Sequence, residues 1–580
     1  MPSVLIEEDV PARMQDGVTL YADVYRPAES GCYPVLLCRM PYGKQLYLPM
    51  SGALLNPVRA AQAGYVVIIQ DTRGRYTSEG QFTYLAQMPQ EGPDGYDTVE
   101  WAASLPYSNG NVGLFGISYF GWTQWAAAML RPPHLRAVVP MQALVGLGEG
   151  IGQRRGAFEL GANLAWHLFT SIDTTTRQLV ASGASGLEIF GAIRTIVAAM
   201  DRLSENGYTE LPLRDLPSLR ELGLNDLLRY LFQRAPGNWP AEYNLVPSAV
   251  EVPSLNIGGW FDIFAQGTLD TYTALRSQGR GQGRQAHLLV GPWSHGNVGG
   301  GFGTTMGEME FGLAAGGALV GFKGDLTTIH LRWFDHWLKG IDNGVDKEAP
   351  VQVFLTGENR WVELPDWPPP GADEQSLYFT AMAGLSASLS PAVSGISRYA
   401  YDPADPAPTL GGNVLMPGVY GVAVKDQRPL SQRPDVLTFT GRALSEPLKV
   451  MGRVVATLWI SSSVPDTDFV VRLLDIHSNG YMQNVCDGIT RTRYRESLTE
   501  ASWLEPGQIY EITVDLWSVA HVFKPGHRIG IQVTSSSFPR WDRNWNTKDE
   551  PGAAIGGPVA QQTIWHDPEH PSHITLPVVR

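Results

Sequence analysis

A short apolar run that turns sharply through small residues into a helix constrains this chain more than any other segment. Val112 to Phe115 is strand-like, Gly116-Ile-Ser118 follows, and Thr123 to Leu130 can form a helix. A strand, tight turn and helix in this order expose the middle side chain of the turn at the carboxyl end of the strand. A lone Gly-x-Ser also occurs where the serine caps the following helix. The rest of the chain therefore has to decide whether Ser118 is a nucleophile or a cap.

Two later segments supply the partners that a serine nucleophile needs. A serine hydroxyl reacts when a base takes its proton and a third group orients that base. Pro253 to Gly259 runs into Asp262, and Ala286 to Gly291 runs into His295. Each apolar run ends in glycine and then a polar residue, as expected of parallel strands at an active-site edge. Ser118, Asp262 and His295 stand in the order of an α/β-hydrolase triad, and we predict that they are catalytic.

Composition narrows the function classes. The chain has 580 residues, 43% of them hydrophobic, so it is too long for one core and suggests an enzyme with several domains. Its net charge of −14 argues against nucleic acid or an anionic membrane as partner. The three cysteines show no metal-ligand spacing, and neither a signal peptide nor a membrane span is apparent. We expect a cytoplasmic protein with no metal that acts on a small molecule.

The pattern of apolar residues changes three times along the chain. Strand-like runs alternate with helical stretches over residues 1–145 and again over 241–350, which predicts an α/β domain in two parts. Residues 146–240 have helical spacing and are predicted to form an inserted helical cap, with Phe169 and Phe190 in its core. Residues 351–580 hold short β-rich runs, beginning with Val351 to Leu355, and predict a jelly-roll or sandwich domain.

Several segments together resemble the cocaine esterase and X-prolyl dipeptidyl aminopeptidase family of serine hydrolases, which also contains cephalosporin acylases and α-amino acid ester hydrolases. They span the whole predicted catalytic region in order. The matching segments are Arg39 to Lys44, Gln70 to Gly80, Asp94 to Trp101, Ser108 to Gly113, Gly116 to Gly121, Gly258 to Asp262, Gly291 to His295 and Leu331 to Leu338. The family's architecture of α/β-hydrolase, helical cap and C-terminal jelly roll agrees with the zones found above.

The resemblance implies a role for each site residue. Ser118 would be the nucleophile, His295 the base and acid, and Asp262 the carboxylate that orients it. Tyr42, after the first parallel strand, would donate its hydroxyl to the oxyanion, and the backbone N–H of Tyr119 would be the second donor. Trp166 lies where family members hold the acyl group with an aromatic side chain. No metal or organic cofactor is implied. Asp71, Arg73 and Arg75 are expected to form a network that fixes loops beside the site.

The loop after Asp262 bears on the substrate. Amino acid ester hydrolases of the family have acidic residues there, whereas this chain has Ile263 to Gly267 without a carboxylate. Phe261 and Phe264 favour an apolar or aryl acyl group, so we predict a carboxylesterase for bulky or aromatic esters. X-prolyl dipeptidyl peptidase, α-amino acid ester hydrolase and β-lactam acylase remain alternatives, as does a carbohydrate- or surface-binding protein. A role for the C-terminal domain in the pocket rim, in stability or in a homodimer is expected.

Overall fold

The computed structural model describes residues 2–148, 150–299, 304–389, 395–416 and 421–580. Within these ranges the largest sheet has ten strands in the order β1-β2-β4-β3-β5-β6-β9-β10-β13-β14. They are β1 (Val4–Arg13), β2 (Thr19–Pro27), β3 (Tyr33–Met40), β4 (Val66–Asp71), β5 (Ser108–Ser118), β6 (Leu135–Ala143), β9 (Ser254–Phe261), β10 (Ala286–Ser294), β13 (Val351–Leu355) and β14 (Arg360–Leu364). β1 and β2 pair antiparallel and form an opening hairpin.

The middle of this sheet is parallel, from β4 and β3 through β10 to β13. A parallel sheet is covered on both faces, which explains why every residue of β4 and β9 is buried. The flanking helices are α2 (Pro57–Gln62), α3 (Glu91–Ser104), α4 (Tyr119–Met129), α9 (Ala265–Gln278) and α10 (Leu326–Lys339). All parallel strands point the same way, so their carboxyl ends form one edge where a site can assemble.

Helix α10 illustrates how the sequence sets an element. Asp325 caps its start by accepting a hydrogen bond from the Thr328 N–H at 2.8 Å, and Gly340 ends it in the left-handed conformation with φ 71°. Its inner face includes Trp333 and Phe334, both fully buried. A side chain at Gly113 of β5 would lie 2.6 Å from the Phe334 ring, so glycine permits the close helix–sheet approach.

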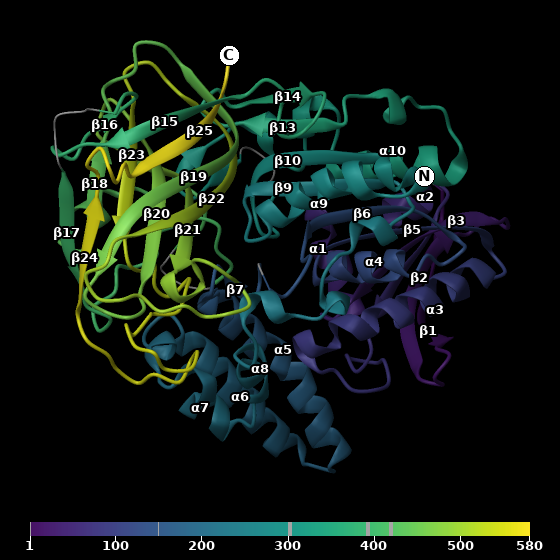
Figure 1. Cartoon of the computed structure of the whole chain (residues 1–580). Coiled ribbons are helices and arrows are strands. Elements are labelled where there is room, and N and C mark those ends of the chain that lie inside the picture. Colours follow the sequence, from purple (N-terminus) through teal and green to yellow (C-terminus); the bar gives the residue numbers. More distant parts are fainter. Residues whose placement is uncertain (1, 149, 300–303, 390–394, 417–420) are drawn as a thin grey trace.

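A helical segment lies between β6 and β9, at the bottom of Figure 1. It contains α5 (Leu160–Ala181), α6 (Gly186–Arg202), α7 (Pro217–Glu221) and α8 (Asp226–Leu231), preceded by a small hairpin of β7 (Gln153–Arg154) and β8 (Ala157–Phe158). The expectation that Phe169 and Phe190 form its core is wrong. They are 44% and 62% exposed, because helical spacing identifies an apolar face without saying whether another element covers it.

The C-terminal part is built from two antiparallel sheets, green to yellow in Figure 1. Among the described residues one sheet has seven strands: β15 (Asp373–Phe379), β16 (Leu385–Ser386), β17 (Ile396–Tyr401), β19 (Leu448–Ser462), β22 (Tyr510–Phe523), β24 (Ala560–Trp565) and β25 (His573–Val579). The other has β18 (Leu437–Thr440), β20 (Asp468–Ile476), β21 (Met482–Arg491) and β23 (Arg528–Thr534). The predicted fold class, an α/β layer followed by a β domain, is confirmed; jelly-roll connectivity stays a prediction.

One strand belongs to a different sheet from the one expected. Val351–Leu355, grouped by its sequence with the C-terminal strands, is β13 and pairs parallel with β10 through Leu288 and Val351. The antiparallel β14 then completes the first sheet. A short apolar run has the same appearance in either sheet, so periodicity alone could not assign it.

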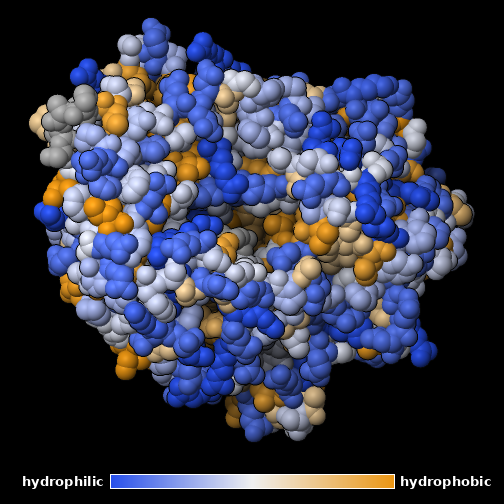
Figure 2. Space-filling model, viewed as in Figure 1, coloured by the Kyte–Doolittle hydropathy of each residue, from blue (hydrophilic) through white to orange (hydrophobic). Residues whose placement is uncertain are grey.

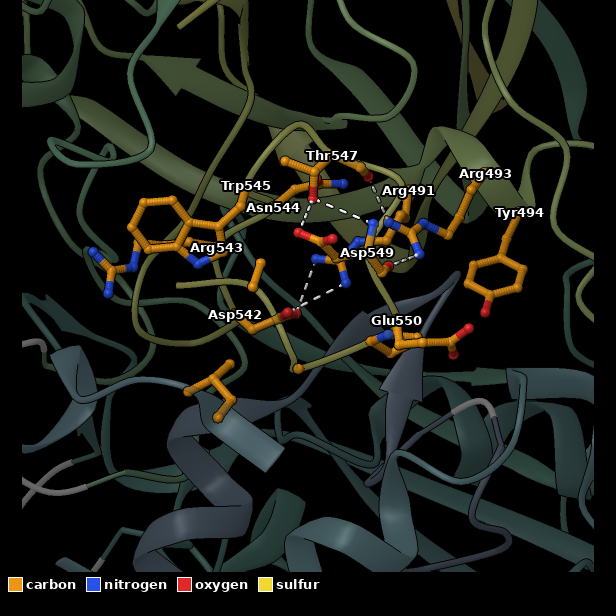
Figure 3. Close-up of a pocket in the computed structure, with 14 residues that line it drawn as sticks. Arg491, Arg493, Tyr494, Asp542, Arg543, Asn544, Trp545, Thr547, Asp549 and Glu550 are labelled. Atoms are coloured by element: carbon orange, nitrogen blue, oxygen red, sulfur yellow. Dashed lines mark hydrogen bonds and ion pairs between the residues drawn. The ribbon is translucent and has the colours of Figure 1, made fainter. Parts of the chain in front are cut away.

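The C-terminal sheets and the helical segment are bonded to each other. Asp542 accepts a hydrogen bond from the Phe158 N–H at 2.7 Å, and its own N–H donates to the Phe158 carbonyl at 2.9 Å. Figure 3 shows Arg491 beside Asp542, and Arg491 also pairs with Asp468. These contacts join the segment around Asp542 to Phe158, which lies just before α5. None of the helices described has the length and hydropathy to traverse a lipid bilayer.

Candidate active site

The predicted turn around Ser118 has the geometry of a nucleophile elbow. Ser118 ends β5 and precedes α4 with φ 61°, a conformation that is strained for a residue with a side chain. A Cβ on Gly116 would lie 2.5 Å from the Phe120 ring, and one on Gly121 would lie 2.5 Å from the Ala143 Cβ. Both glycines are therefore required by packing. Gly121 stands one place later than the second glycine of the common Gly-x-Ser-x-Gly motif, because it faces β6.

His295 and Asp262 meet at the ends of neighbouring parallel strands. Asp262 follows β9 and His295 follows β10, and the His295 Nδ1 lies 2.7 Å from the Asp262 Oδ1. The Asp262 side chain is fully buried, whereas that of His295 is 10% exposed. The Phe264 ring packs against the imidazole at a centroid distance of 5.3 Å, with the two ring planes at 76°. A buried carboxylate on Nδ1 fixes the tautomer of the ring and leaves Nε2 for substrate chemistry.

Tyr42 lies beside Ser118. Its hydroxyl is within hydrogen-bonding reach of the Ser118 side chain and accepts the indole N–H of Trp166 at 2.9 Å. Burial raises the pKa of Tyr42, and the contacts with Trp166 and Ser118 offset part of that rise. The phenol therefore keeps its proton at neutral pH and can donate it to an oxyanion.

A polar network holds the loop that carries Tyr42. Arg75 donates to the Pro41 carbonyl at 2.7 Å and to the Thr170 carbonyl at 2.9 Å, which joins this loop to α5. Asp71 accepts the Lys44 N–H at 2.7 Å. These contacts place Asp71 and Arg75 in the loop-fixing arrangement expected from the sequence. Burial raises the pKa of Asp71 to about 6, with the Lys44 contacts opposing the rise.

Tyr119 places a backbone N–H at the start of α4, and its side chain anchors that end of the helix. It is the first residue of α4, and the first N–H groups of a helix have no partner inside the helix. Its hydroxyl donates to Glu91 at 3.2 Å, and its ring stacks on Trp166 with centroids 6.1 Å apart and planes at 22°. The start of α4 is therefore anchored while its N–H stays available.

The aromatic residues predicted to bind substrate divide into two groups. Trp166 and Phe264 contact the residues that surround Ser118 and His295, as described above. Phe261 instead packs on Phe311, with centroids 5.9 Å apart. Phe169, which the sequence did not single out for binding, is exposed and lies 6.1 Å from the Tyr42 ring. Its exposure beside the half-buried Tyr42 is a signal that appears only in three dimensions.

A hollow opens where the three parts of the molecule meet, and Figure 2 shows hydrophobic surface inside it. A cavity of about 460 Å³ at this junction is lined by Leu144, Ile263, Phe264, Trp517 and further residues of all three parts. Phe264 both lines this cavity and contacts His295, so one side chain links the cavity to the hydrogen-bonded pair of His295 and Asp262. A volume of this size suits a small organic molecule.

Potential metal ligands gather elsewhere. Within the described part of the chain, one group of three (Asp475, His477 and His527) brings its ligand atoms within 4.8 Å of one another. His527 Nδ1 lies 2.8 Å from Asp475 and His477 Nε2 lies 3.1 Å from Gln483, so hydrogen bonds account for their arrangement. This group is in the C-terminal sheets and shares no contact with the triad candidates.

Two further residues contact the loops that carry Asp262 and His295. Gln142 bonds to both neighbours of His295, and Asn413 bonds to the carbonyls of Trp260 and Asp262. A carboxamide that bonds to backbone 150 residues away leaves no local pattern, and so the sequence did not single out either residue.

Comparisons with known proteins agree with this arrangement. Residues 16–297 match the model of the X-Pro dipeptidyl-peptidase (S15 family), and residues 343–575 match the X-Pro dipeptidyl-peptidase C-terminal non-catalytic domain. A cocaine esterase from Rhodococcus sp. is 34% identical, over 99% of this chain and 99% of that protein. A solved α-amino acid ester hydrolase is 27% identical with a TM-score of 0.79, covering 100% of this chain and 97% of its own. An aminopeptidase from a marine sediment Thaumarchaeota archaeon is 26% identical with a TM-score of 0.75, covering 100% and 96%.

Proposed function

The chain belongs to the X-Pro dipeptidyl-peptidase (S15) family of serine hydrolases, and from this premise we propose that it cleaves carboxylic esters with an aromatic or bulky acyl group. The observation that carries the proposal is the aromatic surround of the catalytic groups. Trp166 stacks on Tyr119, and the Phe264 ring packs nearly perpendicular to the His295 imidazole. Flat apolar walls beside the nucleophile favour a flat apolar acyl group.

Catalysis begins at the elbow. The Ser118 Oγ attacks the ester carbonyl while His295 Nε2 takes its proton, and Asp262 stabilises the imidazolium that forms. The negative charge moves to the former carbonyl oxygen. The Tyr42 hydroxyl and the Tyr119 N–H donate to this oxyanion, and each such donor supplies about 3 kcal/mol of transition-state stabilisation.

The second half of the reaction returns the enzyme to its starting state. His295 gives its proton to the leaving alkoxide, and the alcohol departs while Ser118 holds the acyl group as an ester. A water molecule then attacks this ester, with His295 again taking the proton. Collapse of the second tetrahedral intermediate releases the carboxylic acid and restores the Ser118 hydroxyl. These steps use only side chains, backbone donors and water.

The peptidase and amino acid ester hydrolase alternatives need a pocket for a free ammonium, which calls for a carboxylate near the triad. Two carboxylates near the site already have basic partners. Asp270 lies 3.4 Å from Arg453, and Asp173 lies 3.4 Å from Arg75. The loop from Ile263 to Gly267 adds none. These contacts support a neutral acyl group over an amino-terminal one.

A substrate panel tests the proposal. Purified protein is given a nitrophenyl benzoate, a nitrophenyl acetate, Gly-Pro-nitroanilide and a β-lactam with an aryl side chain, each with a Ser118→Ala control. We expect the highest kcat/KM for the benzoate and no turnover by the control. Faster cleavage of Gly-Pro-nitroanilide would replace the esterase with a dipeptidyl peptidase. Turnover of none of the four, with intact folding, would favour the binding-protein alternative.

The location and assembly are also proposals. Cys32, Cys38 and Cys486 are free thiols in the structure, which supports a reducing, cytoplasmic compartment. A homodimer is proposed as the assembly, and sedimentation equilibrium tests it through the molecular mass in solution.

A further inference from the structure

Two buried carboxamides hold the main chain on either side of the hydrogen bond between His295 and Asp262. We propose that Gln142 and Asn413 act together as positioning residues for this catalytic pair. The inference rests on the proposed roles of His295 and Asp262. It also gives the C-terminal part of the chain, which supplies Asn413, a share in catalysis.

Gln142 forms hydrogen bonds with the backbone on both sides of His295. It is the last residue but one of β6 and has φ 42°, and its side chain is fully buried. Its Nε2 donates to the Ser294 carbonyl at 3.0 Å, and its Oε1 accepts the Gly296 N–H at 2.8 Å. One carboxamide therefore matches one acceptor and one donor that bracket the base.

The turn around His295 is closed independently of Gln142. The Ser294 N–H donates to the Asn297 carbonyl at 3.2 Å, and the Asn297 N–H donates to the Ser294 carbonyl at 3.1 Å. Gly296 has φ 67°, which a glycine adopts without strain. The local turn fixes the shape of the loop, while Gln142 fixes its position relative to β6, which pairs with the nucleophile strand β5.

Asn413 forms hydrogen bonds with the loop that carries Asp262, the other partner of the pair. Its side-chain amide donates to the Trp260 carbonyl at 2.9 Å and to the Asp262 carbonyl at 2.8 Å. The residue is 6% exposed. It comes from a segment between β17 and β18, so it reaches Asp262 across the boundary between the C-terminal sheets and the first sheet.

The segment that carries Asn413 is itself fixed. Its neighbour Gly412 exchanges two backbone hydrogen bonds with Ala423, at 2.7 and 3.0 Å. Asn484 of β21 donates its amide to the Ala423 carbonyl at 3.0 Å. This chain of bonds ties the Asp262 loop to the four-stranded sheet, so the C-terminal part acts as the support of the carboxylate.

Gln142 and Asn413 therefore hold the two loops that carry the partners of one hydrogen bond, the 2.7 Å contact between His295 and Asp262. A shift of about 1 Å in a catalytic group can cost about a hundredfold in rate. Loss of either carboxamide would let one partner move away from the other. Once His295 and Asp262 are misaligned by one substitution, the second substitution should change their alignment little. The losses of kcat in the two single variants should therefore be far from additive, as free energies, in the double variant.

The test is a double-mutant cycle with Gln142→Met and Asn413→Leu, which keep side-chain bulk and remove the hydrogen bonds. Steady-state kinetics use the nitrophenyl benzoate, and the active sites are counted with a fluorophosphonate so that kcat refers to folded enzyme. We expect each single variant to lose about tenfold in kcat with KM within twofold of wild type. The double variant should lose about ten- to thirtyfold, well short of the hundredfold expected for independent effects.

Asn256 provides a matched control on the same strands. It is a buried carboxamide of β9 that donates to the Ser254 hydroxyl at 3.0 Å and to the His287 carbonyl at 3.1 Å, at the other end of β9 and β10. Asn256→Leu should lower the melting temperature and leave kcat per titrated site within twofold. If the Gln142 and Asn413 variants behave in the same way, both residues only stabilise the fold and the inference is wrong.

The same experiment separates failure of the inference from failure of the proposed function. His295→Ala is measured alongside. If it abolishes turnover while both carboxamide variants keep the wild-type kcat, the triad stands and the positioning role falls. If His295→Ala keeps the wild-type rate, the proposed function itself is wrong. A double variant that loses the full product of the single losses would contradict joint action on one hydrogen bond.

Discussion

The indole N–H of Trp166 donates to the hydroxyl oxygen of Tyr42 over 2.9 Å, so a residue of helix α5 orients the proposed oxyanion donor, which lies in the loop after β3. The Tyr42 hydroxyl accepts this hydrogen bond through its oxygen and can still donate one through its O–H. With Trp166 on the accepting side, the Tyr42 proton is directed away from the indole. Trp166 thus contacts the oxyanion donor as well as the predicted acyl pocket.

This contact predicts a hierarchy of losses. Tyr42→Phe removes a direct oxyanion donor and should lower kcat by about a hundred- to a thousandfold. Trp166→Phe keeps a ring and removes only the N–H, so we expect a smaller loss of about tenfold in kcat. In a Tyr42→Phe background the same Trp166 change should have almost no further effect on kcat, since the accepting oxygen is gone. Equal losses in both backgrounds would show that Trp166 acts only as a wall of the pocket.

Phe264 should control selectivity between acyl groups. Phe264→Ala removes the ring that packs against His295 and lines the adjoining cavity. We expect kcat/KM for a benzoate ester to fall about tenfold or more relative to an acetate ester, because the aryl group loses an apolar contact. Phe311→Leu, which alters an aromatic pair outside this contact, serves as the control. An equal fall for both esters would assign Phe264 to support of the histidine alone.

The second glycine of the elbow should be intolerant of a side chain. Gly121→Ala would place a Cβ 2.5 Å from that of Ala143 and 2.9 Å from its Cα. Overpacking of this kind costs about 1–3 kcal/mol, and here it also pushes α4 away from β6. Urea denaturation should show the loss, and adding Ala143→Gly should recover part of it. Wild-type stability of Gly121→Ala would mean that the displaced glycine has no packing role.

How much of this site could be predicted differs from residue to residue. Ser118, Asp262 and His295 were predicted because each ends an apolar run, and a strand followed by a polar residue is a local pattern. The neighbourhood of Tyr42 and Trp166 depended on the family resemblance, since 124 residues separate these two side chains in the sequence. Their roles, like those of the triad, are proposals that the experiments above test.

Other features could not be predicted because their cause lies in tertiary structure. Val351–Leu355 joins the first sheet through its register with β10, and nothing within these five residues encodes that register. Phe169 is 44% exposed although it lies on a helix with apolar spacing, and only the packing of α5 against its neighbours decides which of its residues are covered. Gln142 and Asn413 act through single hydrogen bonds to distant backbone atoms, which leave no periodicity or spacing in the sequence.

Buried histidines should make the protein less stable in mild acid. Burial lowers the pKa of His167, His287 and His330 to about 4. The unfolded chain binds more protons at these three sites between pH 6.5 and 4, so the free energy of unfolding falls as the pH drops through this window. Each contributes up to about 1.4 kcal/mol per pH unit. Asp71 and Asp468, whose pKa burial raises to about 6, oppose part of this fall.

The variant His330→Leu isolates one of these protons. Urea unfolding of wild type and variant between pH 7 and pH 4.5 gives the free energy of unfolding at each pH. We expect the variant to lose less stability than wild type on acidification, by up to about 1.4 kcal/mol for each pH unit below 6.5. Parallel curves for the two proteins would show that His330 does not titrate between the folded and unfolded states.

The central claim, that Ser118 is the nucleophile activated by His295 and Asp262, is tested most directly by locating a covalent adduct. Wild type, Ser118→Ala and His295→Ala are incubated with a fluorophosphonate, and the modified peptide is identified by mass spectrometry. The account predicts one phosphonyl group on Ser118 of the wild type, much slower labelling of His295→Ala, and none of Ser118→Ala. Labelling of another residue, or equal labelling of the Ser118→Ala protein, would contradict it.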